Sequence, residues 1–196
     1  MRVEPIRDRE TINRTAEALS HEEGEQGTRR YLMFMTGIYL GRRVCDYRKM
    51  RVGDLLDRQK LEIREKKTGK TIELWIPRKL QKVYAERLRG RDKEEWLFPS
   101  PEKDRITGQR APISYRTLLR DSKHIQQMMR LPPDTNIGTH SWRKTFGYWY
   151  YRTTHDIGGL MKLFNHSKEE TTLIYIGIDS DEKREAFRKV DKMYDL

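Results

Sequence analysis

Apolar residues recur at helical spacing in the segment "TRRYLMFMTGIYL", residues 28–40, a pattern typical of a buried helix. The face formed in this way comprises Tyr31, Leu32, Met35, Ile38 and Tyr39. Gly41 follows directly and is expected to end the helix. A polar helix over "RDRETINRTAEALSHE" precedes this segment. The pattern predicts a loop, "EGEQG", between the two helices.

The pattern changes over "KLEIREKKTGKTIELWIP", residues 60–77. Apolar residues now stand at alternate positions on either side of Thr68-Gly69, namely Leu61, Ile63, Ile72, Leu74 and Ile76. Alternation around a turn signal predicts an antiparallel β-hairpin, here with a basic tip and closed by Pro77.

Helical spacing returns after the hairpin. The segment "RKLQKVYAERLRG" predicts a helix ending at Gly90, "EEWLFPSP" a short extended connection, and "ISYRTLLRDSKHIQQMMR" a helix stopped by Pro132 and Pro133. Further helices are predicted at about 140–154, 156–164 and 168–175, with a charged last helix over "DEKREAFRKVDKMYDL". The predicted fold class is α+β, mostly helical, with one small antiparallel sheet and a single domain over residues 1–196.

Charge narrows the range of partners. The chain has 41 Lys and Arg against 30 Asp and Glu, a net charge of +11 and a pI near 9.7. Such a field attracts polyanions, so nucleic acid or an anionic membrane surface is favoured over a merely basic soluble protein.

Location follows from what the chain lacks. No apolar run approaches the roughly 20 residues needed to span a bilayer, and the start, "MRVEPIRDRE", has no signal-peptide core. Cys45 is the one cysteine, so no intrachain disulfide can form, which suits a reducing compartment. We expect a cytoplasmic protein.

Several polar residues interrupt the apolar pattern. Arg43 follows the buried helix, with Asp46 one helical turn later, which fits either a structural ion pair or a held anion-binding arginine. His140 and Arg143 lie three residues apart near a predicted helix N-terminus, where an anion is favoured. Taken alone, HxxR is a weak motif, and a chance surface pair explains it better.

Three more candidates have plain structural explanations when taken singly. Lys67 stands at the hairpin tip, where lysines are usually solvated. His166 could be a loop histidine with satisfied hydrogen bonds. Tyr175, between Ile174 and Ile176, could be a core ring.

Together, the order and spacing of these segments resemble the tyrosine recombinase (phage integrase) family. That family has an arginine in a G-x-R-x-x-E/D helix, a hairpin lysine, an HxxR box, and a G-H/W followed nine residues later by tyrosine. The matching segments here are "GRRVCDYRKMRVGDL", "KKTGKTIELWIP", "HSWR" and "NHSKEETTLIY", in this order over roughly residues 28–178. The resemblance makes Tyr175 a candidate nucleophile.

The chain departs from the family pattern in three ways. Asn165 replaces the usual glycine before the second histidine, and Lys144 replaces a common histidine after the HxxR arginine. Most relatives also carry a separate N-terminal core-binding domain, for which this chain has almost no residues. A naturally short member and an excised catalytic domain both fit.

The resemblance implies a site-specific DNA recombinase that cleaves and rejoins DNA through a covalent 3′-phosphotyrosyl intermediate, without metal, cofactor or ATP. Tyr175 would attack phosphorus, while Arg43 and Arg143 would bracket the non-bridging oxygens. Two alternatives are a type IB topoisomerase-like enzyme and a non-catalytic DNA-binding module of the same fold. The intact residue set argues against the second.

The remaining residues take the supporting roles in this resemblance. His140 would accept the phenol proton, Lys67 would protonate the departing 5′-oxygen, and His166 would bind a non-bridging oxygen. Asp46 would orient Arg43 from behind.

The last helix bears on assembly. Its apolar residues Ala186, Phe187, Val190, Met193 and Tyr194 fall on one face. In relatives this segment commonly docks in a neighbouring subunit, although it could simply close its own domain. We expect double-stranded DNA as partner, a mostly monomeric protein in free solution and a homo-tetramer on DNA.

Overall fold

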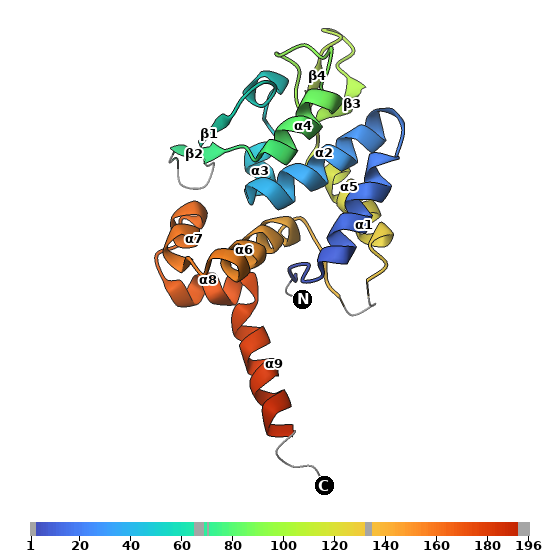
Figure 1. The fold of residues 1–196 in the computed structure, drawn as a ribbon. Coiled ribbons are helices and arrows are strands. Elements are labelled where there is room, and N and C mark those ends of the chain that lie inside the picture. Colours follow the sequence, from blue (N-terminus) through green and yellow to red (C-terminus); the bar gives the residue numbers. More distant parts are fainter. Residues whose placement is uncertain (1–2, 65–68, 70, 132–134, 192–196) are drawn as a thin grey trace.

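The computed structural model describes residues 3–64, 69, 71–131 and 135–191 (Figure 1). Its helices are α1 (Arg9–Ser20), α2 (Gly24–Leu40), α3 (Val44–Tyr47), α4 (Arg78–Arg87), α5 (Tyr115–Met128), α6 (Ser141–Thr154), α7 (Ile157–Phe164), α8 (Glu169–Ile176) and α9 (Ile178–Asp191), with a 3-10 turn at Val52–Asp54. Its strands are β1 (Lys60–Arg64), β2 (Thr71–Trp75), β3 (Pro99–Lys103) and β4 (Arg110–Pro112). The mostly helical α+β class is confirmed.

Helix α2 passes through the main core, as its apolar pattern predicts. Its residues 32–37 are all buried, so burial extends around the helix and beyond the predicted face, of which Tyr31, Ile38 and Tyr39 are only partly buried. Helix α6 crosses it closely, since a Cβ on Gly37 would lie 2.7 Å from the Cβ of Trp142. The Trp142 ring meets Phe34 edge to face, with centroids 5.4 Å apart.

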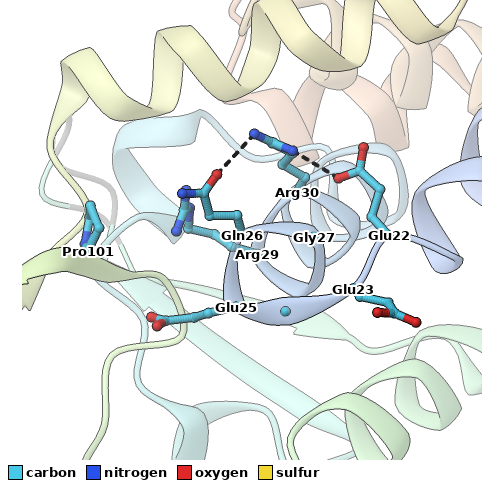
Figure 2. Close-up of a pocket in the computed structure, with 9 residues that line it drawn as sticks. Glu22, Glu23, Glu25, Gln26, Gly27, Arg29, Arg30 and Pro101 are labelled. Atoms are coloured by element: carbon cyan, nitrogen blue, oxygen red, sulfur yellow. Dashed lines mark hydrogen bonds and ion pairs between the residues drawn. The ribbon is translucent and has the colours of Figure 1, made fainter.

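The predicted loop "EGEQG" is wrong, because α2 already begins at Gly24. Side-chain hydrogen bonds hold the first turns of α2 against the residues that precede the helix (Figure 2). The Arg30 guanidinium donates to the Glu22 carboxylate at 3.1 Å and to the Gln26 side-chain oxygen at 3.3 Å. Gly27 allows the close approach, since a Cβ there would lie 2.5 Å from the Glu22 carbonyl oxygen. The hollow at this corner measures about 500 Å³ and lies apart from the candidate site residues.

The predicted hairpin is present as β1 and β2, paired antiparallel with Ile63 opposite Ile72. Its tip, apart from Gly69, lies outside the described residues. The single-sheet prediction is incomplete: β3 and β4 form a second antiparallel pair, with Pro99 opposite Pro112. The sequence of β3, PSPEK, gave no sign of pairing, because it has two prolines, a serine and two charged residues and shows no apolar alternation.

A second, smaller apolar cluster joins α6, α7, α8 and the start of α9. Its buried members are Tyr148, Leu160, Phe164, Ile176 and Ile178. Along α6, Trp142 is fully buried in the main core, whereas Phe146, Trp149 and Tyr150 pack on this second cluster. Helix α9 begins three residues earlier than predicted and runs away from the rest of the molecule (Figure 1).

The N-terminal segment is attached to α6. The backbone N–H of Ile6 donates to Thr145 Oγ1 at 2.9 Å, and the Trp149 indole donates to the Ile6 carbonyl at 3.0 Å. In the part of the chain that the structure describes, every helix falls short of the length and apolar content needed to cross a bilayer.

Candidate active site

The corner between α2 and α3 places Arg43. Gly41 adopts φ 59°, in the left-handed region that favours glycine, and its N–H bonds the Gly37 carbonyl to end α2. Arg43 then caps the N-terminus of α3 and is partly buried. The N–H of Asp46 donates to the Arg43 carbonyl at 2.8 Å, and Asp46 is itself buried. The backbone thus places Asp46 one turn after Arg43, and the predicted orientation of the Arg43 side chain by Asp46 stays a prediction.

Arg143 lies deep between three elements and is 1% exposed. Its guanidinium donates to the Gly41 carbonyl at 2.9 Å and to the Phe164 carbonyl at 3.0 Å, and it stacks 4.0 Å from the centre of the Phe164 ring. These contacts tie the end of α7 to the α2–α3 corner. They also hold the guanidinium plane in one orientation.

His140 and Tyr175 meet at the N-terminus of α6. The Nδ1 atom of His140 lies 3.5 Å from the Tyr175 hydroxyl, although the two residues are 35 positions apart. Partial burial lowers the pKa of His140, and the positive charges of Arg143, Arg43 and Lys144 lower it further. A histidine kept neutral in this way can accept a proton from the phenol at neutral pH.

His166 lies on the other side of the tyrosine. Its ring centroid is 5.4 Å from that of Tyr175, and its Nδ1 is 3.0 Å from Thr172 Oγ1 on α8. Asn165 ends α7 with φ 53°, and the N–H of His166 bonds the Met161 carbonyl at 2.9 Å. After glycine, asparagine is the residue that most readily adopts this backbone, so the Asn165 departure keeps the turn that presents His166.

Lys67 lies outside the described residues, so its predicted role stays a prediction. Lys144, the other departure, is 4% exposed and donates to the Val3 carbonyl at 2.8 Å. Its Nζ lies 5.0 Å from the centre of the Tyr175 ring. The structure thus places a lysine at the nucleophile candidate from α6.

Two supporting residues were not predicted. Phe164 is 1% exposed, and its ring contacts those of Tyr175 and His166, with centroids 5.7 Å and 5.5 Å apart. Arg42 is equally buried and donates to the Leu163 carbonyl at 2.5 Å. Arg42 stands between Gly41 and Arg43, so no local signal in the sequence marks it as the more deeply buried of the two arginines.

Gly147 lets α8, the helix that carries Tyr175, approach α6. A Cβ at this position would lie 2.7 Å from Ile176 and 2.8 Å from Phe164. Any other residue would therefore push α8 outward and move Tyr175.

The arrangement joins a phenol, two histidines and several cations within one surface region. Such a set is of the kind that attack on a phosphodiester needs, because nearby cations stabilise the charge that develops on phosphate oxygens. Among the described residues, no three His, Cys, Asp or Glu side chains gather closely enough to hold a metal ion.

Comparison with known proteins identifies the family of the chain. Residues 8–182 match the model of the phage integrase family. The chain is 33% identical over 186 residues to the probable integrase/recombinase YoeC of Bacillus subtilis (strain 168). This match covers 95% of this chain and 96% of that protein.

Solved structures share the fold at low identity. XerA recombinase superposes with a TM-score of 0.69 at 20% identity, over 95% of this chain and 65% of its own. The catalytic domain of bacteriophage HP1 integrase gives 0.55 at 15% identity, over 88% and 86%. A lambda integrase tetramer bound to a Holliday junction gives 0.64 at 15% identity, over 89% and 48%. The chain therefore spans less than two thirds of XerA and about half of that lambda integrase.

Proposed function

Since the chain belongs to the phage integrase family, we propose that it cleaves and rejoins DNA at specific sites through a covalent 3′-phosphotyrosyl intermediate formed by Tyr175. The bond from phosphorus to the 5′-oxygen breaks as the bond to the phenol oxygen forms. The phosphotyrosyl ester keeps the diester's energy, so a 5′-hydroxyl can rejoin the strand without ATP or a metal.

The observation that carries the proposal is the meeting of His140 and Tyr175. They come from separate helices, yet the imidazole Nδ1 lies 3.5 Å from the phenol oxygen. A phenol has a pKa near ~10 and attacks poorly at neutral pH without a base or nearby cations. His140, with its lowered pKa, supplies the base.

The arginines neutralise the phosphate in this proposal. In support of this role, the positive charges of Arg143 and Arg43 are close enough to His140 to lower its pKa. Guanidinium suits non-bridging oxygens because it stays charged and presents several donors in one plane. Each preorganised donor of this type contributes on the order of 10²–10³ in rate.

The remaining roles concern the leaving group and orientation. Lys67 would protonate the departing 5′-oxygen, His166 would donate to a non-bridging oxygen, and Asp46 would orient Arg43. The Thr172 contact supports the role of His166, because it fixes the ring next to Tyr175.

We further propose that DNA drives assembly through α9. The described part of its predicted apolar face is uncovered: Phe187 is 76% exposed and Val190 is 46% exposed. Met193 and Tyr194 lie outside the described residues. An exposed apolar face needs a groove, and a neighbouring copy on DNA can supply one. The lambda integrase tetramer bound to a Holliday junction supports the assembly of several copies on DNA.

Adduct trapping tests the central proposal. The protein is incubated with a library of randomised duplexes carrying a nick near the centre, where loss of a short fragment traps the covalent intermediate. Protein–DNA adducts are then isolated after denaturation and sequenced. The wild-type protein should give adducts enriched in one sequence, joined at Tyr175 as mapped by mass spectrometry.

Tyr175→Phe is the matched control, because it removes one oxygen and keeps the ring. Adducts should vanish while the circular dichroism spectrum and non-covalent binding to the recovered duplex stay as in the wild type. A covalent 3′ adduct with the Phe variant, or none with the wild type, would contradict the proposal.

A further inference from the structure

Lys144 is a buried cation beside the candidate nucleophile, and the roles proposed above do not use it. Lysine is seldom buried to this degree unless its ammonium is held by partners. Here the Nζ atom donates to the Val3 carbonyl at 2.8 Å and lies 5.0 Å from the centre of the Tyr175 ring. The side chain thus spans from the N-terminal segment to the nucleophile helix.

Helical spacing lets His140 and Lys144 act on the same ring. Residues four apart lie on one face of a helix. His140 approaches the hydroxyl of Tyr175, and Lys144 approaches the ring itself. His140 therefore acts on the proton of the phenol, whereas Lys144 acts on the orientation and the charge of the ring.

The N-terminal segment determines where the ammonium lies. Two consecutive residues of α6 bind the N-terminal segment. Lys144 donates to the Val3 carbonyl, and the Thr145 hydroxyl accepts from the Ile6 N–H. Between them, the N–H of Glu4 bonds the Asn136 carbonyl at 2.8 Å. A lysine has a long flexible stem, and an anchored carbonyl acceptor restricts that stem to one direction.

We propose that Lys144 is a positioning residue for Tyr175: its ammonium, anchored by the Val3 carbonyl, orients the phenol ring and stabilises the phenolate. A cation over an aromatic face is attracted by the ring, and a positive charge within about 4–6 Å favours an ionised acid. The consequence for DNA cleavage rests on the proposed function, whereas the effect on the phenol does not.

Other charged groups surround the same phenol and stay in place when Lys144 is changed. His140 faces the hydroxyl from α6, and His166 faces the ring from the α7–α8 turn. Arg43 and Arg143 act on His140 from the α2–α3 corner and from α6. The test therefore compares variants that differ only in the charge at position 144.

The experiment is an NMR titration of the protein labelled with ¹³C at the tyrosine Cζ. The signal of Tyr175 is the one that disappears in Tyr175→Phe. In Lys144→Met, which keeps the apolar stem without the charge, the pKa of the Tyr175 phenol should rise by about one unit. In Lys144→Arg, which keeps the charge, it should stay near the wild-type value.

Cleavage of the duplex recovered by adduct trapping gives a second measurement. Loss of the cation raises the pKa of the phenol and of His140 together, so the pH profile of Lys144→Met should move to higher pH. Its rate at neutral pH should fall about tenfold. A merely structural role would lower the rate at every pH without moving the profile.

Lys60→Met is the matched control. Lys60 also lies over an aromatic ring, 4.5 Å from the centre of Trp75, but on the β1–β2 hairpin. It should leave the titration of Tyr175 unchanged.

An unchanged phenol pKa in folded Lys144→Met would overturn the proposal. Should that variant fail to fold, the wild type still decides, because the proposal requires a nuclear Overhauser effect between the Lys144 ε-methylene and the Tyr175 ring. Absence of that effect would also overturn it. A wild type that forms no DNA adduct would contradict the proposed function and leave the phenol titration as the test of Lys144.

Discussion

The two apolar clusters of the molecule are held together in different ways. The main cluster, around α2 and α4, buries many aliphatic and aromatic side chains, with Trp142 as its contact to α6. The second cluster, which carries Tyr175, is small. Much of its connection to the main body is through buried cations that donate to backbone carbonyls: Arg42 to Leu163 and Arg143 to Gly41 and Phe164.

This difference separates stability from orientation. Apolar burial is roughly proportional to area and has no direction, so the main cluster supplies most of the folding free energy. A hydrogen bond contributes less in net terms, but it fixes an angle and a distance. We infer that the nucleophile helix is accurately oriented and opens at a lower free energy than the main body.

The largest expected effect comes from the main cluster. Trp142→Ala removes a fully buried ring and should lower the free energy of unfolding by about 3–5 kcal/mol. Phe164→Ala in the second cluster should leave the main transition closer to the wild type, while it abolishes adducts by freeing Tyr175. Urea unfolding followed by circular dichroism, with hydrogen exchange of α7 and α8, measures both.

If Trp142→Ala and Phe164→Ala lowered the free energy of unfolding in the main urea transition equally, the proposed difference between the two clusters would be wrong. The clusters would then form one cooperative unit. Normal adduct formation by Phe164→Ala would show that the ring is not needed to hold Tyr175.

The next largest effect is expected on the rate of DNA cleavage, when one of the charged residues proposed to act on the phosphate is removed from the main body. Arg43→Ala should reduce cleavage by roughly 10²–10³, because a phosphate-facing donor is lost. Lys67→Ala should be slow on normal DNA and recover on a 5′-bridging phosphorothioate, since a thiolate leaves without a proton. Single-turnover cleavage of both substrates measures this.

Arg43→Ala is the control for Lys67→Ala. Its cleavage rate should stay low on the 5′-bridging phosphorothioate substrate. Equal recovery of both variants would mean that Lys67 binds phosphate and is not the acid.

The smallest effect on the isolated chain is expected at α9. Truncation after residue 180 removes most of an exposed helix, so the remaining chain should keep its fold and should sediment, like the full chain, as the monomer expected in free solution. On duplex DNA, the full chain should form larger assemblies and the truncated chain should not. Sedimentation velocity with and without duplex compares them.

Assembly of the truncated chain like that of the full chain would contradict docking through α9. The helix would then be dispensable for contacts between copies.

Much of the fold could be predicted from the sequence alone, because a local signal is strong where a single residue fixes the backbone conformation. The end of α2 follows from Gly41, which adopts the left-handed region. The β1–β2 hairpin follows from alternation around a turn, and the family follows from motifs in a distinctive order. The roles of the six predicted site residues and of Asp46 stay predictions.

Only the tertiary structure decided what surrounds Tyr175. His140 and Tyr175 lie 35 positions apart and meet because Gly147 lets α8 approach α6. The contact between Lys144 and the Val3 carbonyl joins residues 141 positions apart. No local pattern encodes such a contact, since its energy depends on which segments the fold brings together, and the helical period at Lys144 would be the same without Val3.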